Sequence, residues 1–183
     1  SLGQIAMGHE IGVTALQITM AYCAIANGGY LIKPRLIKQI LNSKNEVVYK
    51  EKPSVIRRIQ NKNNMEEIRK MLRKVVSDGT GQNAEINGWD IAGKTGTAQK
   101  SIAGNYSRNK INTFASIFPA TDPKYVFVVM LDEPKPSKNY IYEYKDGSGW
   151  KIKGTQFNTA GWTAVEVAGK IIEKIGPILA TKY

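Results

Sequence analysis

A lysine, two threonines and two glycines stand together at residues 93–97, and no other stretch of the chain combines side chains so suited to binding chemistry. The short apolar stretch Ile91-Ala92 leads into them, and the alternating threonines suit a β-strand. Because side chains alternate across a strand, we expect Thr95 and Thr97 on one side and Lys94 on the other. Two hydroxyls on one side can bind a single anionic group, so this stretch predicts an anion-binding strand.

Gly96 lies between the two threonines, and a residue without a side chain lets a ligand approach the backbone closely. Lys94 can hold a carboxylate, or it can lower the pKa of a neighbouring nucleophile. The alternative is an ordinary exposed strand, because three common residues also occur together by chance. The rest of the chain has to distinguish these two interpretations.

Composition limits the classes of protein to consider. With 183 residues, 42% of them hydrophobic and 22% charged, the chain is long enough for one domain with a sizeable core. No apolar run is long enough to cross a membrane. The net charge of +11 suits an anionic partner such as a nucleic acid, a membrane face or an acidic polymer. The cations are spread from Lys33 to Lys182 without a dense run, so we do not predict nucleic-acid binding.

We predict no metal site and no cofactor. The chain has one cysteine, Cys23, and one histidine, His9. His9-Glu10 begins like a zinc motif, but Val13 stands where a second histidine is needed. Cys23 lies in an apolar stripe of a predicted helix, so we interpret it as a core residue and not as a reactive thiol.

An apolar helix is predicted over residues 13–27, ahead of the threonine strand. Thr14 is its expected cap, and Gly28-Gly29 supplies a left-handed stop. Apolar residues cover nearly all sides of this helix, which predicts that it is buried.

Residues 30–60, which follow this helix, are predicted to form a small hairpin subregion or meander. Its strands are expected at residues 36–41, 47–49 and 55–59, with a turn at residues 42–45.

Two amphipathic helices are also predicted. One begins after Asn64, with Glu67 completing a capping box, and its basic face is expected to point into water. That face consists of Arg69, Lys70, Arg73 and Lys74. The other helix runs from residue 162 to residue 175 and stops at Gly176-Pro177.

Two further strands are expected at residues 111–118 and 125–131, after a polar, turn-like stretch at residues 101–110. Their short connections imply one antiparallel sheet, so the predicted fold class is α/β of the α+β type, with helices packed on that sheet. The strand at 125–131 is apolar without alternation, which predicts that other elements cover both of its faces.

An irregular segment at 132–158 holds aromatic residues that either line a ligand site or pack the loop. They are Tyr140, Tyr142, Tyr144 and Trp150.

Separate stretches in the same order resemble the carboxy-terminal part of the transpeptidase domain of class B penicillin-binding proteins, the division-specific members above all. Residues 92–99 match the family's A-G-K-T-G-T-A-Q strand. The other matching stretches are residues 13–17 and 26–29 (V-T-P-L-Q and A-N-G-G), 79–84 (G-T-G-x-x-A), 114–134 (the following hairpin) and 160–162 (the start of the final helix). Ala15 replaces the family's proline, and Ser116-Ile117 replaces its V-G, without effect on the expected fold.

The resemblance implies that the nucleophile lies outside this chain. In the family, a serine with a lysine one helical turn later and an S-x-N motif both precede the K-T-G strand. Here Ser107 and Lys110 match S-x-x-K by letter only, after the strand and in polar sequence, and Ser43-Lys44-Asn45 matches S-x-N in the wrong order. Residues 1–183 are therefore expected to be the carboxy-terminal part of one transpeptidase domain of the serine β-lactamase-like fold. Without its other half, the strand at 125–131 would keep an open edge and favour self-association.

The activity implied by the resemblance is cross-linking of peptidoglycan stem peptides through a serine acyl-enzyme in septal cell-wall synthesis, with β-lactams acylating the same serine. Thr95, Gly96 and Thr97 are implied to bind the D-alanyl-D-alanine end of the substrate. Lys94 is implied to act beside the nucleophile, and the Thr97 N–H to stabilise the oxyanion.

The resemblance also implies a place for the parent protein. It is expected on the periplasmic side of the bacterial inner membrane, with an amino-terminal anchor and with cell-division partners that include a membrane glycosyltransferase. Two alternatives remain open. One is a non-catalytic penicillin-sensing or scaffolding domain of the same fold, and the other is a basic module that binds an anionic polymer.

Overall fold

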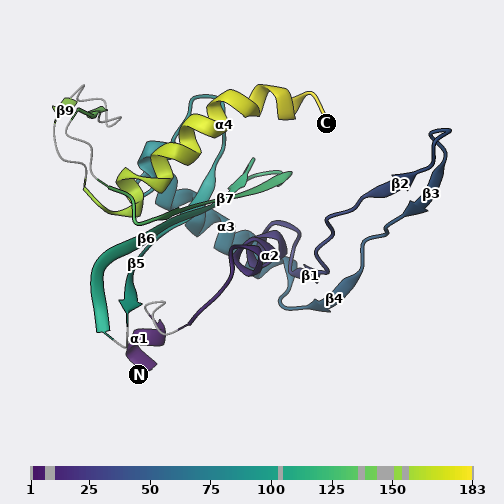
Figure 1. Ribbon diagram of the computed structural model, residues 1–183, viewed down its shortest axis with the longest axis horizontal. Helices are drawn as coiled ribbons and strands as arrows, with labels where there is room; N and C mark the ends of the chain where they lie inside the picture. The colour runs from purple at the N-terminus through teal and green to yellow at the C-terminus, as the bar shows by residue number, and fades with distance from the viewer. Residues whose placement is uncertain are drawn as a thin grey trace.

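The computed structural model of the chain describes residues 2–6, 11–102, 105–135, 139–143, 151–153 and 157–182. Its centre is a three-stranded antiparallel sheet in the order β5-β6-β7, with helices on both faces (Figure 1). The strands are β5 (Ala92–Ile102), β6 (Asn105–Phe118) and β7 (Tyr125–Asp132). The expected fold class, an antiparallel sheet packed with helices, is confirmed.

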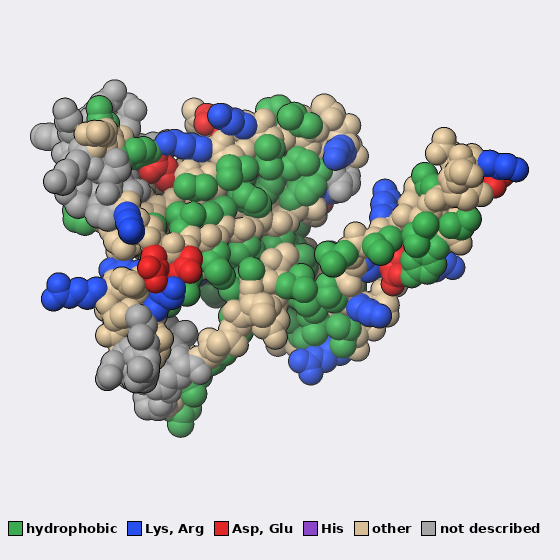
Figure 2. Space-filling model, viewed as in Figure 1, with side chains coloured by type: hydrophobic (Ala, Val, Ile, Leu, Met, Phe, Trp, Pro, Cys, Tyr) green, Lys and Arg blue, Asp and Glu red, His purple; other side chains and the backbone are tan. Residues whose placement is uncertain are grey.

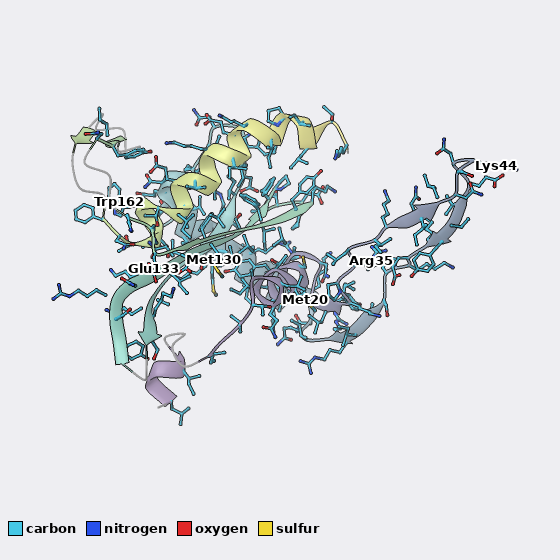
Figure 3. The ribbon with its side chains drawn as sticks, viewed as in Figure 1. Met20, Arg35, Lys44, Met130, Glu133 and Trp162 are labelled. Atoms are coloured by element: carbon cyan, nitrogen blue, oxygen red, sulfur yellow. The ribbon has the colours of Figure 1, made fainter. Side chains whose placement is uncertain are left out.

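Lys94 lies on one face of the sheet, together with the residues paired with it across the strands. Lys94 lies opposite Ala115 of β6, which in turn lies opposite Val128 of β7. Side chains at directly opposed positions share a face, so these three point the same way. Helix α2 (Ala15–Ala26) packs on this side, and Figure 3 shows Met130 of β7 beside this helix.

The other face holds the main core. Thr95 lies opposite Phe114, which pairs with Val129, and this row points toward helix α4 (Ala164–Ala180). Burying each large apolar side chain contributes about 1.5–3 kcal/mol, so this layer stabilises the fold strongly. Its buried members are Val76, Ala84, Ile86, Ile91, Phe114, Phe118, Val129, Ala164, Val165, Ala168 and Ile172.

Helix α2 has the ends that its sequence predicts. Thr14 caps it in a reciprocal box with Gln17. At the other end Gly28 and Gly29 have φ values of +84° and +103°, which side-chain-bearing residues rarely adopt. The expected burial on nearly all sides is wrong, because Ala24 is the only fully buried residue of this helix.

Cys23 of α2 is half-buried, and burial raises the pKa of its thiol. A thiol kept protonated is a poor nucleophile, which agrees with the interpretation of Cys23 as a packing residue.

The segment that follows α2 projects from the body as a narrow ribbon (Figures 1 and 2). Strand β1 (Tyr30–Ile32) pairs with β4 (Val55–Arg58), and beyond them β2 (Gln39–Leu41) pairs with β3 (Val47–Lys50). The predicted hairpin and its turn are confirmed, whereas a meander is not. The strand expected from residue 36 begins later, at Gln39, and Leu36 is 97% exposed.

Helix α3 (Lys62–Ser77) begins three residues earlier than predicted. Asn61 is the cap, because its side-chain oxygen accepts the Asn64 N–H at 2.8 Å. Glu67 consequently lies inside the helix and pairs with Lys70 at 2.6 Å, so the predicted capping box is wrong.

Arg73 is not part of a solvated face, contrary to the sequence prediction. Its guanidinium makes two hydrogen bonds of 2.6 Å to Glu85 and lies 3.0 Å from Asp90. Its hydrogen bonds to the Glu85 carboxylate raise the pKa of Arg73, which therefore stays charged. Arg73 also donates to the carbonyl of Ile91 at 3.3 Å, so it ties α3 to the start of β5.

Helix α4 continues through Gly176 and Pro177 to Ala180, so the predicted stop at residue 175 is wrong. A side chain at position 176 would overlap the ring of Trp89. Gly176 therefore serves close packing between helix and ring, and this contact explains a glycine that resembles a helix terminator in the sequence.

The remaining elements are short. They are α1 (Leu2–Ala6), the 3₁₀ turns Gln82–Ala84 and Ala160–Trp162, and the paired strands β8 (Ile141–Glu143) and β9 (Lys151–Lys153). Most of the stretch at 101–110, expected as a turn, extends β5 and β6. His9, Glu10, Tyr144 and Trp150 lie outside the described residues.

Within the described ranges, no helix has the length and apolarity needed to span a membrane. The same residues include no group of three or more potential metal ligands.

Strand β7 has a free edge within the described part of the chain, since β6 is its only strand partner there. Its side chains are mostly half-buried, not covered on both faces as predicted, and Met130 is 41% exposed. Unpaired edge groups recruit other strands. We therefore expect the isolated chain to self-associate, by pairing along β7 or by exchanging α4 between copies.

Sedimentation velocity at several concentrations measures this association. A lysine at Met130 (Met130→Lys) should shift the population toward monomer, because an exposed charge blunts an edge strand. A concentration-independent monomer with protected β7 amides would show that the chain closes its own sheet.

Candidate functional site

The threonine row of β5 opens into a hollow of about 330 Å³. One wall is the turn after α3, with Gly79 and Thr80, and the opposite wall is the segment that precedes α4, with Thr159 and Trp162. Figure 3 shows Trp162 close to the start of α4. Three segments far apart in the sequence thus meet around two hydroxyl groups.

Each hydroxyl in the row is held by a neighbour. The Thr95 hydroxyl lies 2.9 Å from the Thr80 hydroxyl. The Thr97 hydroxyl accepts the Ala160 N–H at 2.9 Å. An accepting hydroxyl keeps its own hydrogen free to donate, so Thr97 is set to donate into the hollow, and Thr95 likewise when Thr80 is the donor.

The spacing of the two hydroxyls suits one planar anion. Residues two apart on a strand lie about 7 Å from each other. The two oxygens of a carboxylate can bridge that distance with ordinary hydrogen bonds of about 2.7 Å. Thr95 is half-buried and Thr97 exposed, so a ligand can reach both.

Lys94 starts on the opposite face, in a second hollow of about 630 Å³ that it shares with Ile18 and Tyr22 of α2. Its ammonium bends toward the strand edge, donates to the Thr95 carbonyl at 2.9 Å and lies 3.5 Å from the Thr95 hydroxyl. The charge therefore lies beside the hydroxyl row while the side chain also lines the α2 side. One cation can in this way serve groups on both faces of β5.

The two glycines of the motif have different surroundings. A Cβ at Gly93 would lie 2.6 Å from the buried ring of Phe114 and 2.8 Å from the Ala115 carbonyl. A Cβ at Gly96 would meet only Thr113, at 3.9 Å, which is ordinary contact. Packing therefore requires glycine at position 93 but not at position 96.

The serines that match catalytic motifs by letter lie elsewhere. Ser107 is in strand β6, where its hydroxyl accepts the Asn109 N–H at 3.2 Å, and Lys110 donates to Asn158. Ser43 is in the turn at the tip of the projecting ribbon, next to Lys44 (Figure 3). Neither serine opens a helix, which agrees with the sequence-based expectation that the nucleophile is not one of them.

Of the loop aromatics, Tyr140 is half-buried and its hydroxyl accepts from Lys170 of α4 at 2.5 Å. Tyr140 borders a different, smaller hollow with Leu131 and Thr163. This position favours loop packing for Tyr140. The side chain of Tyr142 is outside the described part of the structure, as are Tyr144 and Trp150.

Sequence reasoning missed the supports of the hydroxyl row. Thr80 was visible only as part of a turn, and the Ala160 N–H is a backbone group without any sequence signal. Asn112, opposite Thr97 in β6, did carry a signal, because it is a polar residue at an inward position of an apolar strand.

Comparison with known proteins agrees with this geometry. Residues 1–149 match the penicillin binding protein transpeptidase domain family. Stage V sporulation protein D of Bacillus subtilis is 37% identical over 132 residues, which cover 71% of this chain and 20% of that protein. Penicillin-binding protein PbpB of Mycolicibacterium smegmatis is 36% identical over 74% of this chain and 22% of its own length.

Solved structures show the same fold. Penicillin-binding protein 3 of Mycobacterium tuberculosis, in a complex with aztreonam, superposes with a TM-score of 0.69 at 31% identity, over 92% of this chain and 37% of that one. The chain belongs to the penicillin-binding-protein transpeptidase family. Its relatives place it among the class B members. The chain spans about a fifth of the length of these two curated relatives.

The contrast between the glycines gives a stability test. Gly93→Ala should destabilise the fold by about 1–3 kcal/mol, because the added methyl group overlaps a buried ring and a carbonyl. Gly96→Ala should change stability by less than about 1 kcal/mol, because its methyl group meets only ordinary contact. Urea unfolding measures both, and equal losses would contradict the different roles assigned to the two glycines.

Proposed function

We propose that this chain is the carboxy-terminal part of the transpeptidase domain of a peptidoglycan D,D-transpeptidase. The single observation that carries the proposal is the supported hydroxyl row of Thr95 and Thr97, open to a hollow and beside the ammonium of Lys94. The relatives whose names specify peptidoglycan D,D-transpeptidases, such as the Caulobacter vibrioides protein FtsI at 28% identity, add support.

The proposed ligand is the D-alanyl-D-alanine end of a stem peptide. The Thr95 and Thr97 hydroxyls donate to its terminal carboxylate, and Lys94 adds positive charge beside them. Gly96 lets the peptide lie close along the β5 edge. β-Lactams, which carry a carboxylate in a similar place, occupy the same row.

The proposed reaction is acyl transfer in two steps. A serine supplied from outside this chain attacks the peptide carbonyl, the terminal D-alanine leaves, and an acyl-enzyme forms. The amine of a neighbouring stem then takes the acyl group and frees the serine. The Thr97 N–H on the β5 edge is the proposed oxyanion donor from this chain, and losing one such donor typically costs about 2.7–4 kcal/mol in the transition state.

The proposal includes a cellular setting. The parent protein acts in septal cell-wall synthesis on the periplasmic side of the inner membrane. An amino-terminal anchor holds it there, beside cell-division proteins that include a membrane glycosyltransferase.

A penicillin-sensing or scaffolding domain is the competing function, since it would keep the same hydroxyl row without turnover. The net charge of +11 keeps an anionic-polymer module as a third candidate, which salt-dependent heparin retention would support.

The first functional test uses the chain by itself. Residues 1–183 should form no covalent adduct with benzylpenicillin, because neither Ser107 nor Ser43 lies at the start of a helix beside the hydroxyl row. Intact-mass spectrometry measures this directly. An adduct mapped to Ser107 would overturn the assignment of the nucleophile to another part of the protein.

The second functional test concerns Lys94 in the full-length protein. Lys94→Ala should slow acylation by penicillin about 100-fold or more, because it removes the charge beside the reacting groups. Stability should change by no more than about 0.5 kcal/mol, because Lys94 is exposed. Stopped-flow acylation and urea unfolding measure the two effects.

Lys100→Ala is the matched control for Lys94→Ala. Lys100 lies on the same strand, but its ammonium pairs with Asp132 and Glu133 at 3.0 and 2.8 Å, away from the hydroxyl row. This variant should acylate normally. Near-native acylation by the Lys94 variant would remove Lys94 from the site.

A further inference from the structure

A buried amide in the neighbouring strand supports the wall that holds Thr97. Asn112 of β6 is fully buried and lies directly opposite Thr97, on the same face of the sheet. Its amide nitrogen donates to the Asn158 side chain at 2.8 Å and to the Thr163 hydroxyl at 2.9 Å. Both hydrogens of one side chain are therefore used to hold the two ends of the segment 158–163.

That segment contains the partner of the Thr97 hydroxyl. Ala160 lies between the two residues that Asn112 binds, and its N–H donates to Thr97 Oγ1 at 2.9 Å. The Thr163 hydroxyl, which accepts from Asn112, donates in turn to the Thr159 carbonyl at 2.8 Å. The hydrogen bonds thus form a path from Asn112, through the segment, to the hydroxyl in the hollow.

A second amide fixes the same segment from the other wall. Asn83 donates to the Gly161 carbonyl at 2.8 Å. Asn83 thereby joins the segment to the turn that carries Thr80, the partner of Thr95. The segment is anchored on both sides, and Asn112 is its anchor to the sheet.

Asn112 is an unusual choice for packing alone. Its side-chain oxygen is buried and has no hydrogen-bond partner within the described residues. A buried unsatisfied oxygen costs stability, so an apolar side chain of similar size would serve the core at least as well. The two donated hydrogen bonds are the property that an apolar residue cannot supply.

We infer that Asn112 is a positioning residue for carboxylate binding: it sets the Ala160 N–H, which aligns the Thr97 hydroxyl toward the ligand. This inference rests on the proposed function. Without the amide, the segment keeps its place only approximately, and the hydroxyl loses the partner that directs its hydrogen into the hollow. Binding of a carboxylate should weaken, while steps that do not involve the carboxylate should be unchanged.

The test compares two ligands on the full-length protein. One is benzylpenicillin, which has a free carboxylate, and the other is its methyl ester, which does not. The measured quantity is the ratio of their second-order acylation rates. Asn112→Leu should lower this ratio about tenfold with little change for the ester, since one hydrogen bond to a charged group is lost.

Three further variants make the result specific. Thr97→Val should lower the ratio in the same way. Ser116→Ala should leave it unchanged, because Ser116 is equally buried on the same strand face but donates to the Phe127 carbonyl, away from the segment. Asn158→Ala removes the same 2.8 Å bond from the less buried side, and it should reproduce the Asn112 effect even if Asn112→Leu folds poorly.

Hydrogen exchange of the peptide 157–163 gives a readout that does not depend on acylation. The Ala160 amide should exchange about tenfold faster in Asn112→Leu and Asn158→Ala than in Ser116→Ala. An unchanged ratio, or an equal loss for both ligands, would overturn the positioning role. No acylation of the wild type, or a Thr97→Val ratio equal to that of the wild type, would instead overturn the proposed function and this inference with it.

Discussion

The long antiparallel pairing of β5 with β6 is the constraint on which the rest of the structure depends. It places Lys94 opposite Ala115 on the α2 face, and Thr97 opposite Asn112 on the α4 face. A slip of one residue would exchange the two faces, since side chains alternate along a strand. The hydroxyl row would then face α2, and the lysine would enter the core. Burial of Phe114 and Phe118 under α4 fixes the register, so the apolar core and the candidate site are set by the same pairing.

The walls of the site come from elements that the core holds in place. Arg73 ties α3 to the start of β5 through Glu85, Asp90 and the Ile91 carbonyl, and the turn with Thr80 follows this helix directly. The opposite wall is the segment that precedes α4, and the buried residues of α4 pack on the same core. The hydroxyl groups are therefore held on both sides by segments anchored to the core, which is what a site needs if it binds a carboxylate without rearranging.

Much of this arrangement was accessible from the sequence, because it follows from local patterns. Alternation predicted the faces of Lys94 and Thr95, the cap at Thr14 predicted the start of α2, and short apolar runs predicted the antiparallel sheet. The errors concern residues whose role is set by distant partners. Arg73 has the spacing of a solvated helix face but meets Glu85, and Gly176 has the form of a helix stop but accommodates Trp89. Apolar residues of α2 indicated burial on nearly all sides, yet Ala24 is its only fully buried residue.

The site residues also differ in whether local sequence or distant partners determine their role. The strand motif predicted which side chains line the hollow, but their supports come from segments between 15 and 63 residues away: Thr80, the Ala160 N–H and Asn112. Such contacts leave little trace in a single sequence. Asn112 is the exception, as a polar residue at an inward strand position, and an unexplained buried amide of this kind is a useful pointer to a supported site.

The central claim is that Thr95 and Thr97 together bind the carboxylate of the ligand. A crystal structure of the full-length protein acylated by benzylpenicillin measures this directly. We expect the carboxylate oxygens to lie within about 3 Å of both threonine hydroxyls, with the Ala160 N–H still bonded to Thr97. A carboxylate directed to the α2 side of the sheet, or into solvent without contact to either hydroxyl, would contradict the account.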